Sequence, residues 1–193
     1  MGKNRVEAFS DGVMAILITI MVLEIKIPHA AGLHELATVL PALISYLLSF
    51  VFIGIYWNNH HHLFHAVQHV NGQVLWANLH LLFWLSLIPA VNYWIGDSAF
   101  SALSVASYGC VLLLAGIAYF LLTRSLVSEC ADNPTLAAAI GNDAKGKISL
   151  AIYAVGIPCA FLNPWIGYGL YVLVAAVWLV PDRRIERTLT NKC

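Results

Sequence analysis

The sequence predicts an all-α membrane protein with six transmembrane helices. Of its 193 residues, 60% are hydrophobic and only 10% are charged, whereas a soluble domain carries about 25% charged residues. The apolar residues are collected into long segments with short polar connections between them. The formal net charge is zero, which gives no electrostatic reason to expect nucleic-acid binding.

The first apolar segment is expected to form a helix from Phe9 to Ile27, and Pro28 ends it. A helix of this length reaches about 28 Å at a rise of about 1.5 Å per residue, enough to cross the hydrocarbon core of a bilayer. No small-residue cleavage site follows a short apolar stretch. We therefore expect this segment to be retained rather than removed as a signal peptide.

Five further segments repeat the pattern of a long apolar run closed by turn-forming residues. They are expected at about 36–69, 74–94, 100–122, 148–162 and 165–180. The second continues beyond Trp57 as a polar, histidine-containing helix. Pro89 and Pro158 lie inside the third and fifth segments, where proline is expected to kink a helix. No internal repeat or long linker divides the chain, so residues 1–193 are predicted to form a single transmembrane domain.

The basic residues are distributed unevenly between the two sides of the membrane. With six crossings, both termini share a side with the connections after the second and fourth segments. That side carries Lys3, Arg5, Arg124, Lys145, Lys147, Arg183, Arg184, Arg187 and Lys192. The opposite side carries only Lys26. Because Lys and Arg concentrate in cytoplasmic connections, the sequence predicts cytoplasmic N- and C-termini.

A stripe of bulky apolar residues follows one face of the first helix. Ile16, Ile20, Leu23 and Ile27 fall at i, i+4, i+7 and i+11. Thr19 lies beside this stripe and supplies the only hydroxyl in the middle of the segment. The spacing alone is typical of a helix that packs against lipid or a neighbouring helix.

A group of polar residues lies at the start of the same helix. Asp11 is an ionisable group about one turn inside the apolar segment, which marks a structural or functional site. Arg5 and Asp11 are six residues apart and lie on nearly opposite sides of a helix, so we expect their partners on other helices. Ser10 beside Asp11, without a Gly-x-Ser-x-Gly pattern, is weak evidence for a hydrolase, and we do not expect an enzyme.

A histidine-rich stretch extends the second helix. On a helix, His65 and His69 share a face with either His61 or His62, a spacing that could hold a metal ion. The run supplies no Cys, Asp or Glu to complete such a site. We therefore favour a polar helix end at the cytoplasmic interface, where one or two imidazoles contact the head of the first helix.

Two motifs in these helices resemble a known family. The first helix carries Arg5-x-x-x-Phe9-Ser10-Asp11-Gly12-Val13, and the second carries Trp57-x-x-His60-His61-x-x-Phe64. Both are similar to signatures of the transmembrane protein 175 family, the lysosomal/endosomal potassium channels and their bacterial relatives. With the six-helix plan, the resemblance covers essentially the whole chain.

The resemblance implies a potassium-permeable cation channel in a bacterial plasma membrane, with K⁺ as the permeating ion, membrane lipids around it and no cofactor. It implies a homotetramer, because the motif occurs once, and a pore lined by the first helix. The sequence lacks a Thr-Val-Gly-Tyr-Gly carbonyl filter. Carried over by position, the pore constriction is Ile16, Ile20 and Leu23, with Thr19 adjacent. The structural network is Arg5, Phe9, Ser10, Asp11, Trp57, His60 and His61.

Two other classes of membrane protein remain as alternatives. A secondary transporter or proton-coupled carrier usually places charges near the bilayer midplane and often contains inverted repeats. The central parts of the predicted helices carry no acidic residue, and no repeat is visible. A haem or metal protein that uses the histidines is the third class.

Overall fold

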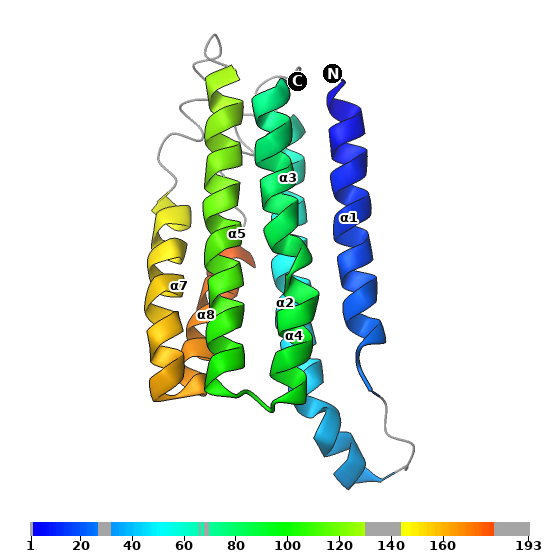
Figure 1. Cartoon of the computed structure of the whole chain (residues 1–193), viewed down its shortest axis with the longest axis vertical. Coiled ribbons are helices and arrows are strands. Elements are labelled where there is room, and N and C mark those ends of the chain that lie inside the picture. Colours follow the sequence, from blue (N-terminus) through cyan, green and yellow to red (C-terminus); the bar gives the residue numbers. More distant parts are fainter. Residues whose placement is uncertain (1, 27–31, 66, 68–69, 130–143, 180–193) are drawn as a thin grey trace.

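The computed structural model describes residues 2–26, 32–65, 67, 70–129 and 144–179. These residues form an elongated helical bundle (Figure 1). Its helices are α1 (Lys3–Leu23), α2 (Leu33–His65), α3 (Gly72–Ser86), α4 (Ile88–Asp97), α5 (Ala102–Glu129), α7 (Ala144–Leu162) and α8 (Pro164–Leu179). Within the described ranges, five spans are long and apolar enough to cross a membrane, and α8 is a shorter apolar helix. The predicted all-α membrane class is confirmed.

The third span is two helices stacked end to end rather than one kinked helix. Pro89 lies in the first turn of α4 and has no N–H to donate to the carbonyl of Leu85. The chain breaks at Leu87, which ends α3 and precedes α4. The span is therefore interrupted at Leu87, two residues before Pro89.

The helix ends differ from the expected ones at several places. The first helix begins at Lys3 rather than Phe9 and ends at Leu23, so its polar head is itself helical. The second ends at His65, and the expected end at His69 lies outside the described residues. The other observed bounds are 102–129 for the fourth span, 144–162 for the fifth and 164–179 for the sixth.

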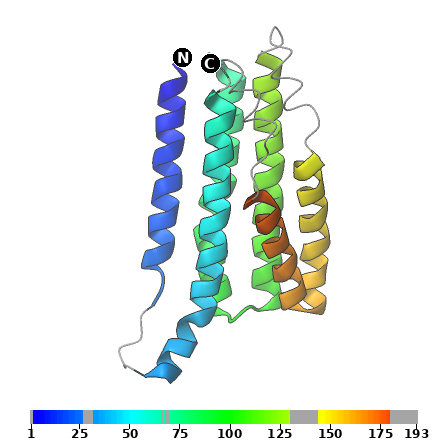
Figure 2. The same cartoon turned by 180° about the vertical axis from the view of Figure 1, so that it is seen from behind.

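Helix α1 lies at one edge of the bundle, whereas α5 lies among α3, α4, α7 and α8 (Figure 2). One face of α1 is buried against α2, α3 and α4. That face consists of Val6, Ser10, Met14, Leu17 and Met21. The spacing of four, four, three and four residues is the period of one helical face. The opposite face of α1 has no neighbour within the described chain.

A buried polar cluster ties α4 to the rest of the bundle. Ser49 of α2 donates to the side-chain oxygen of Asn92 on α4 at 3.0 Å, and its hydroxyl lies 2.9 Å from that of Tyr108 on α5. All three residues are buried. Because the bilayer core offers no water to pair with such groups, the three helices satisfy one another.

Two glycines make room for a buried tyrosine where α5, α7 and α8 meet. Tyr171 of α8 is fully buried. A Cβ atom added to Gly109 of α5 would overlap the Tyr171 hydroxyl, and one added to Gly156 of α7 would lie 2.6 Å from its ring. The close approach of these helices therefore depends on the absence of side chains at both positions.

We expect Gly109→Ala to lower the thermal midpoint of the detergent-solubilised protein, because overpacking a well-filled core costs about 1–3 kcal/mol. Gly169→Ala on α8 is the matched control, since a Cβ there meets nothing within 4 Å. That variant should be neutral or slightly stabilising, because alanine favours a helix. Equal midpoints for the two variants would show that the α5–α8 contact is not tightly packed.

Candidate functional site

The expected stripe on α1 lies on the face that points away from the bundle. Ile16, Ile20 and Leu23 are 57%, 40% and 82% exposed. Thr19 is also exposed, and its hydroxyl donates to the carbonyl of Ile16 at 2.8 Å. Ile18, by contrast, is half-buried and packs against the core. The stripe can therefore contact other molecules, whereas Ile18 packs inside its own bundle.

At the head of α1, Asp11 contacts helix α2 as expected. The indole nitrogen of Trp57 donates to Asp11 Oδ1 at 3.0 Å. The His61 ring stacks on Trp57 with 6.3 Å between ring centroids. Both rings lie on the exposed surface of α2. This contact fixes the rotation of α1 relative to α2 near the expected cytoplasmic end.

A second, fully buried contact joins three helices at the same level. Asn78 of α3 donates through Nδ2 to Ser10 Oγ at 3.0 Å, and its Oδ1 lies 2.8 Å from His60 Nε2. Because the amide oxygen can only accept, His60 must carry its proton on Nε2 and donate it. The Ser10 hydroxyl in turn donates to the Val6 carbonyl at 2.8 Å. The expected contact between His60 and the head of α1 is thus indirect, with Asn78 between them.

Asn78 is the residue of this group that the sequence reasoning missed. Asn78 carries no charge, but an amide within an apolar helix signals a polar partner on another helix in the same way as an ionisable group does. His80 faces outward and accepts a hydrogen bond from Trp84, one turn along its own helix, at 2.9 Å. It takes no part in the contact between α1 and α3.

Two members of the expected network lie apart from it. Phe9 is exposed, and so is Arg5, whose side chain makes no hydrogen bond or ion pair with any described residue. The structure therefore pairs Asp11 directly with Trp57, and it joins Ser10 to His60 through Asn78. It leaves Arg5 and Phe9 on the open face of α1.

The histidine run provides no metal site within the described part of the chain. The rings of His61 and His65 lie 6.0 Å apart, but no three His, Cys, Asp or Glu side chains gather there or elsewhere among these residues. His69, a member of both predicted ligand sets, lies outside the described residues.

A second polar region lies at the opposite end of α1. A cavity of about 230 Å³ opens between the ends of α1, α2 and α4, and its lining includes Glu24, Lys26, Asn92, Tyr93 and Asp97. One carboxylate oxygen of Glu24 is buried with no hydrogen-bond partner among the described residues. Burial raises the pKa of this carboxyl above its usual range. Charged groups therefore border both ends of the apolar stripe on α1.

We expect Asn78→Leu to destabilise the protein by about 1–2 kcal/mol, because it leaves the buried His60 N–H without an acceptor. The thermal midpoint in detergent measures this effect. Asn58→Leu, at an exposed position of α2, is the matched control and should change stability by less than about 0.5 kcal/mol. An unchanged midpoint for Asn78→Leu would mean that the buried hydrogen bonds of Asn78 do not hold α1 in place.

Comparison with known proteins supports the family resemblance that the two motifs indicated. Residues 5–89 match the family model described as endosomal/lysosomal potassium channel TMEM175. A potassium channel of Chryseobacterium sp. (strain P1-3) is 51% identical over 189 residues, which cover 98% of each chain. The human endosomal/lysosomal proton channel TMEM175 is 36% identical over 80 residues, 35% of this chain and 16% of the human one.

A solved structure has the same arrangement of helices. The crystal structure of a lysosomal potassium-selective channel TMEM175 homolog from Chamaesiphon minutus superposes with a TM-score of 0.79. It has 25% sequence identity over 92% of this chain and 96% of that chain. Together with the bacterial relative of nearly equal length, this shows that the chain is an integral membrane protein of the TMEM175 family, whose members are ion channels and not enzymes.

Proposed function

We propose that this chain is the subunit of a potassium-permeable cation channel whose pore is lined by α1. The observation that carries the proposal is the two-faced character of α1 at the edge of the bundle. One face packs on α2, α3 and α4, and the other exposes a stripe of large apolar residues. The related bacterial proteins named as potassium channels support the choice of ion.

A single α1 cannot enclose a pore, so several copies must meet on a symmetry axis. The family resemblance favours four copies, each a single six-helix transmembrane domain. In such a ring the exposed stripes of α1 face the axis, and the opposite, buried face stays fixed to its own bundle. Arg5 and Phe9, exposed at the head of α1, are then available to a neighbouring subunit.

The constriction is hydrophobic and uses no ring of backbone carbonyls. Under symmetry, Ile16, Ile20 and Leu23 become stacked apolar rings, which hold water poorly when they are narrow. Potassium sheds its hydration shell more easily than sodium, so modest potassium selectivity follows. Thr19 donates its proton to the Ile16 carbonyl, which leaves the lone pairs of its oxygen free to face a cation.

The polar contacts at the head of α1 position the pore helix. Asp11 is tied to Trp57, and Ser10 is tied through Asn78 to His60. These hydrogen bonds connect α1 to two helices of its own bundle. They determine how the stripe is oriented, but they do not involve the stripe residues themselves. Their role is structural support of the pore, without direct contact with the ion.

The distribution of basic residues supports cytoplasmic termini in a bacterial plasma membrane. Of the basic residues that the structure describes, those near the start of α1, the end of α5 and the start of α7 lie at one end of the bundle, and Lys26 lies at the other (Figure 1). This arrangement follows the positive-inside rule. The apolar constriction then connects a basic cytoplasmic side to the cavity beside Glu24.

Purified wild-type protein in liposomes should carry potassium faster than sodium down equal gradients, and its mass in mild detergent should equal that of four chains. Because the vertebrate relatives are named proton channels, a proton gradient belongs in the same assay. Transport that requires a proton gradient and saturates with substrate would favour the proton-coupled carrier. A conducting monomer would contradict the shared pore.

Ile16→Asn should raise potassium flux and weaken the preference over sodium, because an amide wets the ring that the family resemblance implies as the principal constriction. Ile18→Asn is the matched control, since Ile18 faces the core. It should lower the yield of folded protein by placing an amide in the core. Selectivity measured for both variants separates the roles. Equal effects on selectivity would show that the stripe is ordinary packing.

A further inference from the structure

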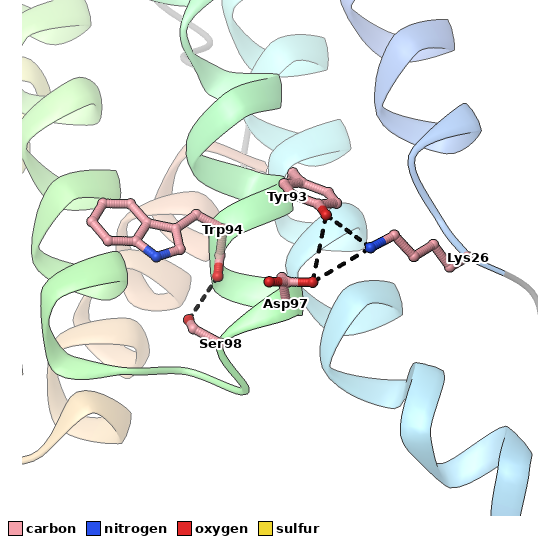
Figure 3. Close-up of polar contacts among 5 residues, drawn as sticks. All are labelled: Lys26, Tyr93, Trp94, Asp97 and Ser98. Carbon is pink, nitrogen blue, oxygen red and sulfur yellow. Dashed lines mark hydrogen bonds and ion pairs between the residues drawn. The ribbon is translucent and has the colours of Figure 1, made fainter.

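The single basic residue of the predicted outer side is held by two groups of α4. Lys26 Nζ donates to the Tyr93 hydroxyl at 2.8 Å and lies 3.5 Å from Asp97 Oδ1. The Tyr93 hydroxyl donates to the same carboxylate oxygen at 3.5 Å. Figure 3 shows the Lys26 side chain extending from the segment after α1 across to these two residues. The three groups form a closed triangle.

This triangle contributes little to the stability of the fold. The side chains of Lys26 and Asp97 are 75% and 57% exposed, and exposed ion pairs are typically worth about 0–1 kcal/mol. The ammonium also lies 5.1 Å from the centroid of the Tyr93 ring, a contact that is weak at exposed sites. Any effect of these residues on function therefore arises from their electrostatic potential and not from the stability of the fold.

The location of the triangle makes that field important. Lys26 is three residues beyond Leu23, which is the last residue of α1 and the last described residue of the exposed stripe. Symmetric copies of α1 around a pore would bring copies of Lys26 together at its outer entrance. A ring of lysines there would repel cations, because rings of charge at an entrance select permeating ions by sign. Lys26 alone is thus unfavourable for a cation channel.

We propose that Asp97 neutralises Lys26 at the outer entrance of the pore and is thereby a determinant of cation entry. The inference rests on the proposed channel function and on α1 as the pore helix. An ammonium 3.5 Å from a carboxylate acts on a distant ion as a dipole, whose potential decays faster than that of an isolated charge. Asp97 thus removes the barrier that Lys26 would create.

The balance of charges around the cavity has the sign that a cation channel needs. Its lining contains two carboxylates, Glu24 and Asp97, and one ammonium, Lys26. The hydrogen bond to Tyr93 and the charge of Asp97 raise the pKa of Lys26, so its charge persists and must be offset. With Lys26 paired to Asp97, no described residue of the cavity lining carries an unbalanced positive charge.

Three variants, two control variants and the wild type test this inference by potassium flux into liposomes at about 10 mM and about 1 M salt, where the Debye length is about 30 Å and 3 Å. Asp97→Asn should lower flux at least about twofold at low salt, and the deficit should shrink at high salt. Lys26→Gln should equal or exceed wild type. The double variant Lys26→Gln/Asp97→Asn should recover, because it removes the unpaired lysine.

Tyr93→Phe and Asp97→Glu are the matched controls. The first removes the two hydrogen bonds of the Tyr93 hydroxyl but keeps both charges. The second keeps the carboxylate, so both variants should conduct like wild type. Equal, salt-independent losses for Asp97→Asn and Lys26→Gln would show a mechanical latch and overturn the proposal. Unchanged flux in Asp97→Asn overturns it too. A wild type without potassium flux at either salt would overturn the channel function and this inference together.

Discussion

A polar group inside the hydrocarbon region must find its partner within the protein, and the contact between α1 and the bundle depends on this constraint. The buried chain from Ser10 through Asn78 to His60 satisfies each group with another from a different helix. A rotation of α1 by one residue would separate Ser10 from Asn78 and leave the buried amide nitrogen of Asn78 without this acceptor. These hydrogen bonds therefore determine which face of α1 is buried and, as a result, which face is exposed.

The buried face of α1 determines which residues form its exposed face. Val6, Met14 and Leu17 fill the core, so the residues on the opposite face of α1 cannot also pack inside their own subunit. Exposed apolar side chains are ordinary on a membrane helix, because lipid covers them. A pore helix differs in that its apolar face meets water and ions. The family to which the chain belongs supplies the reason to place this face on an axis.

The sequence predicted much of the fold, because hydropathy and the charge distribution report directly on the membrane. It also predicted that Asp11 has a partner on another helix, since an ionisable residue in an apolar helix requires one, and the family resemblance placed Trp57 in the same network. Asn78 was missed because hydrophobic residues surround it and it carries no charge. The sequence predicted a kink at Pro89, whereas the span is interrupted at Leu87. The reason is that the hydrogen bond that Pro89 cannot make would go to a carbonyl of the preceding turn.

The contact of Lys26 with Asp97 could not be read from the sequence at all. It joins residues far apart in the chain, and each belongs to a short connection or a helix end where spacing carries no pattern. Which side chains meet there depends on how the helices are tilted. The same holds for Ser49, Asn92 and Tyr108, whose polar groups meet only because three helices cross at one level.

The interruption at Leu87 gives α1 two independent points of attachment. One face of α1 packs against both α3 and α4, and Ser10 of α1 is hydrogen-bonded to Asn78 of α3. Helices α3 and α4 meet at Leu87, where the helix is interrupted before Pro89. Any change in the angle between α3 and α4 therefore shifts one contact relative to the other and tilts α1.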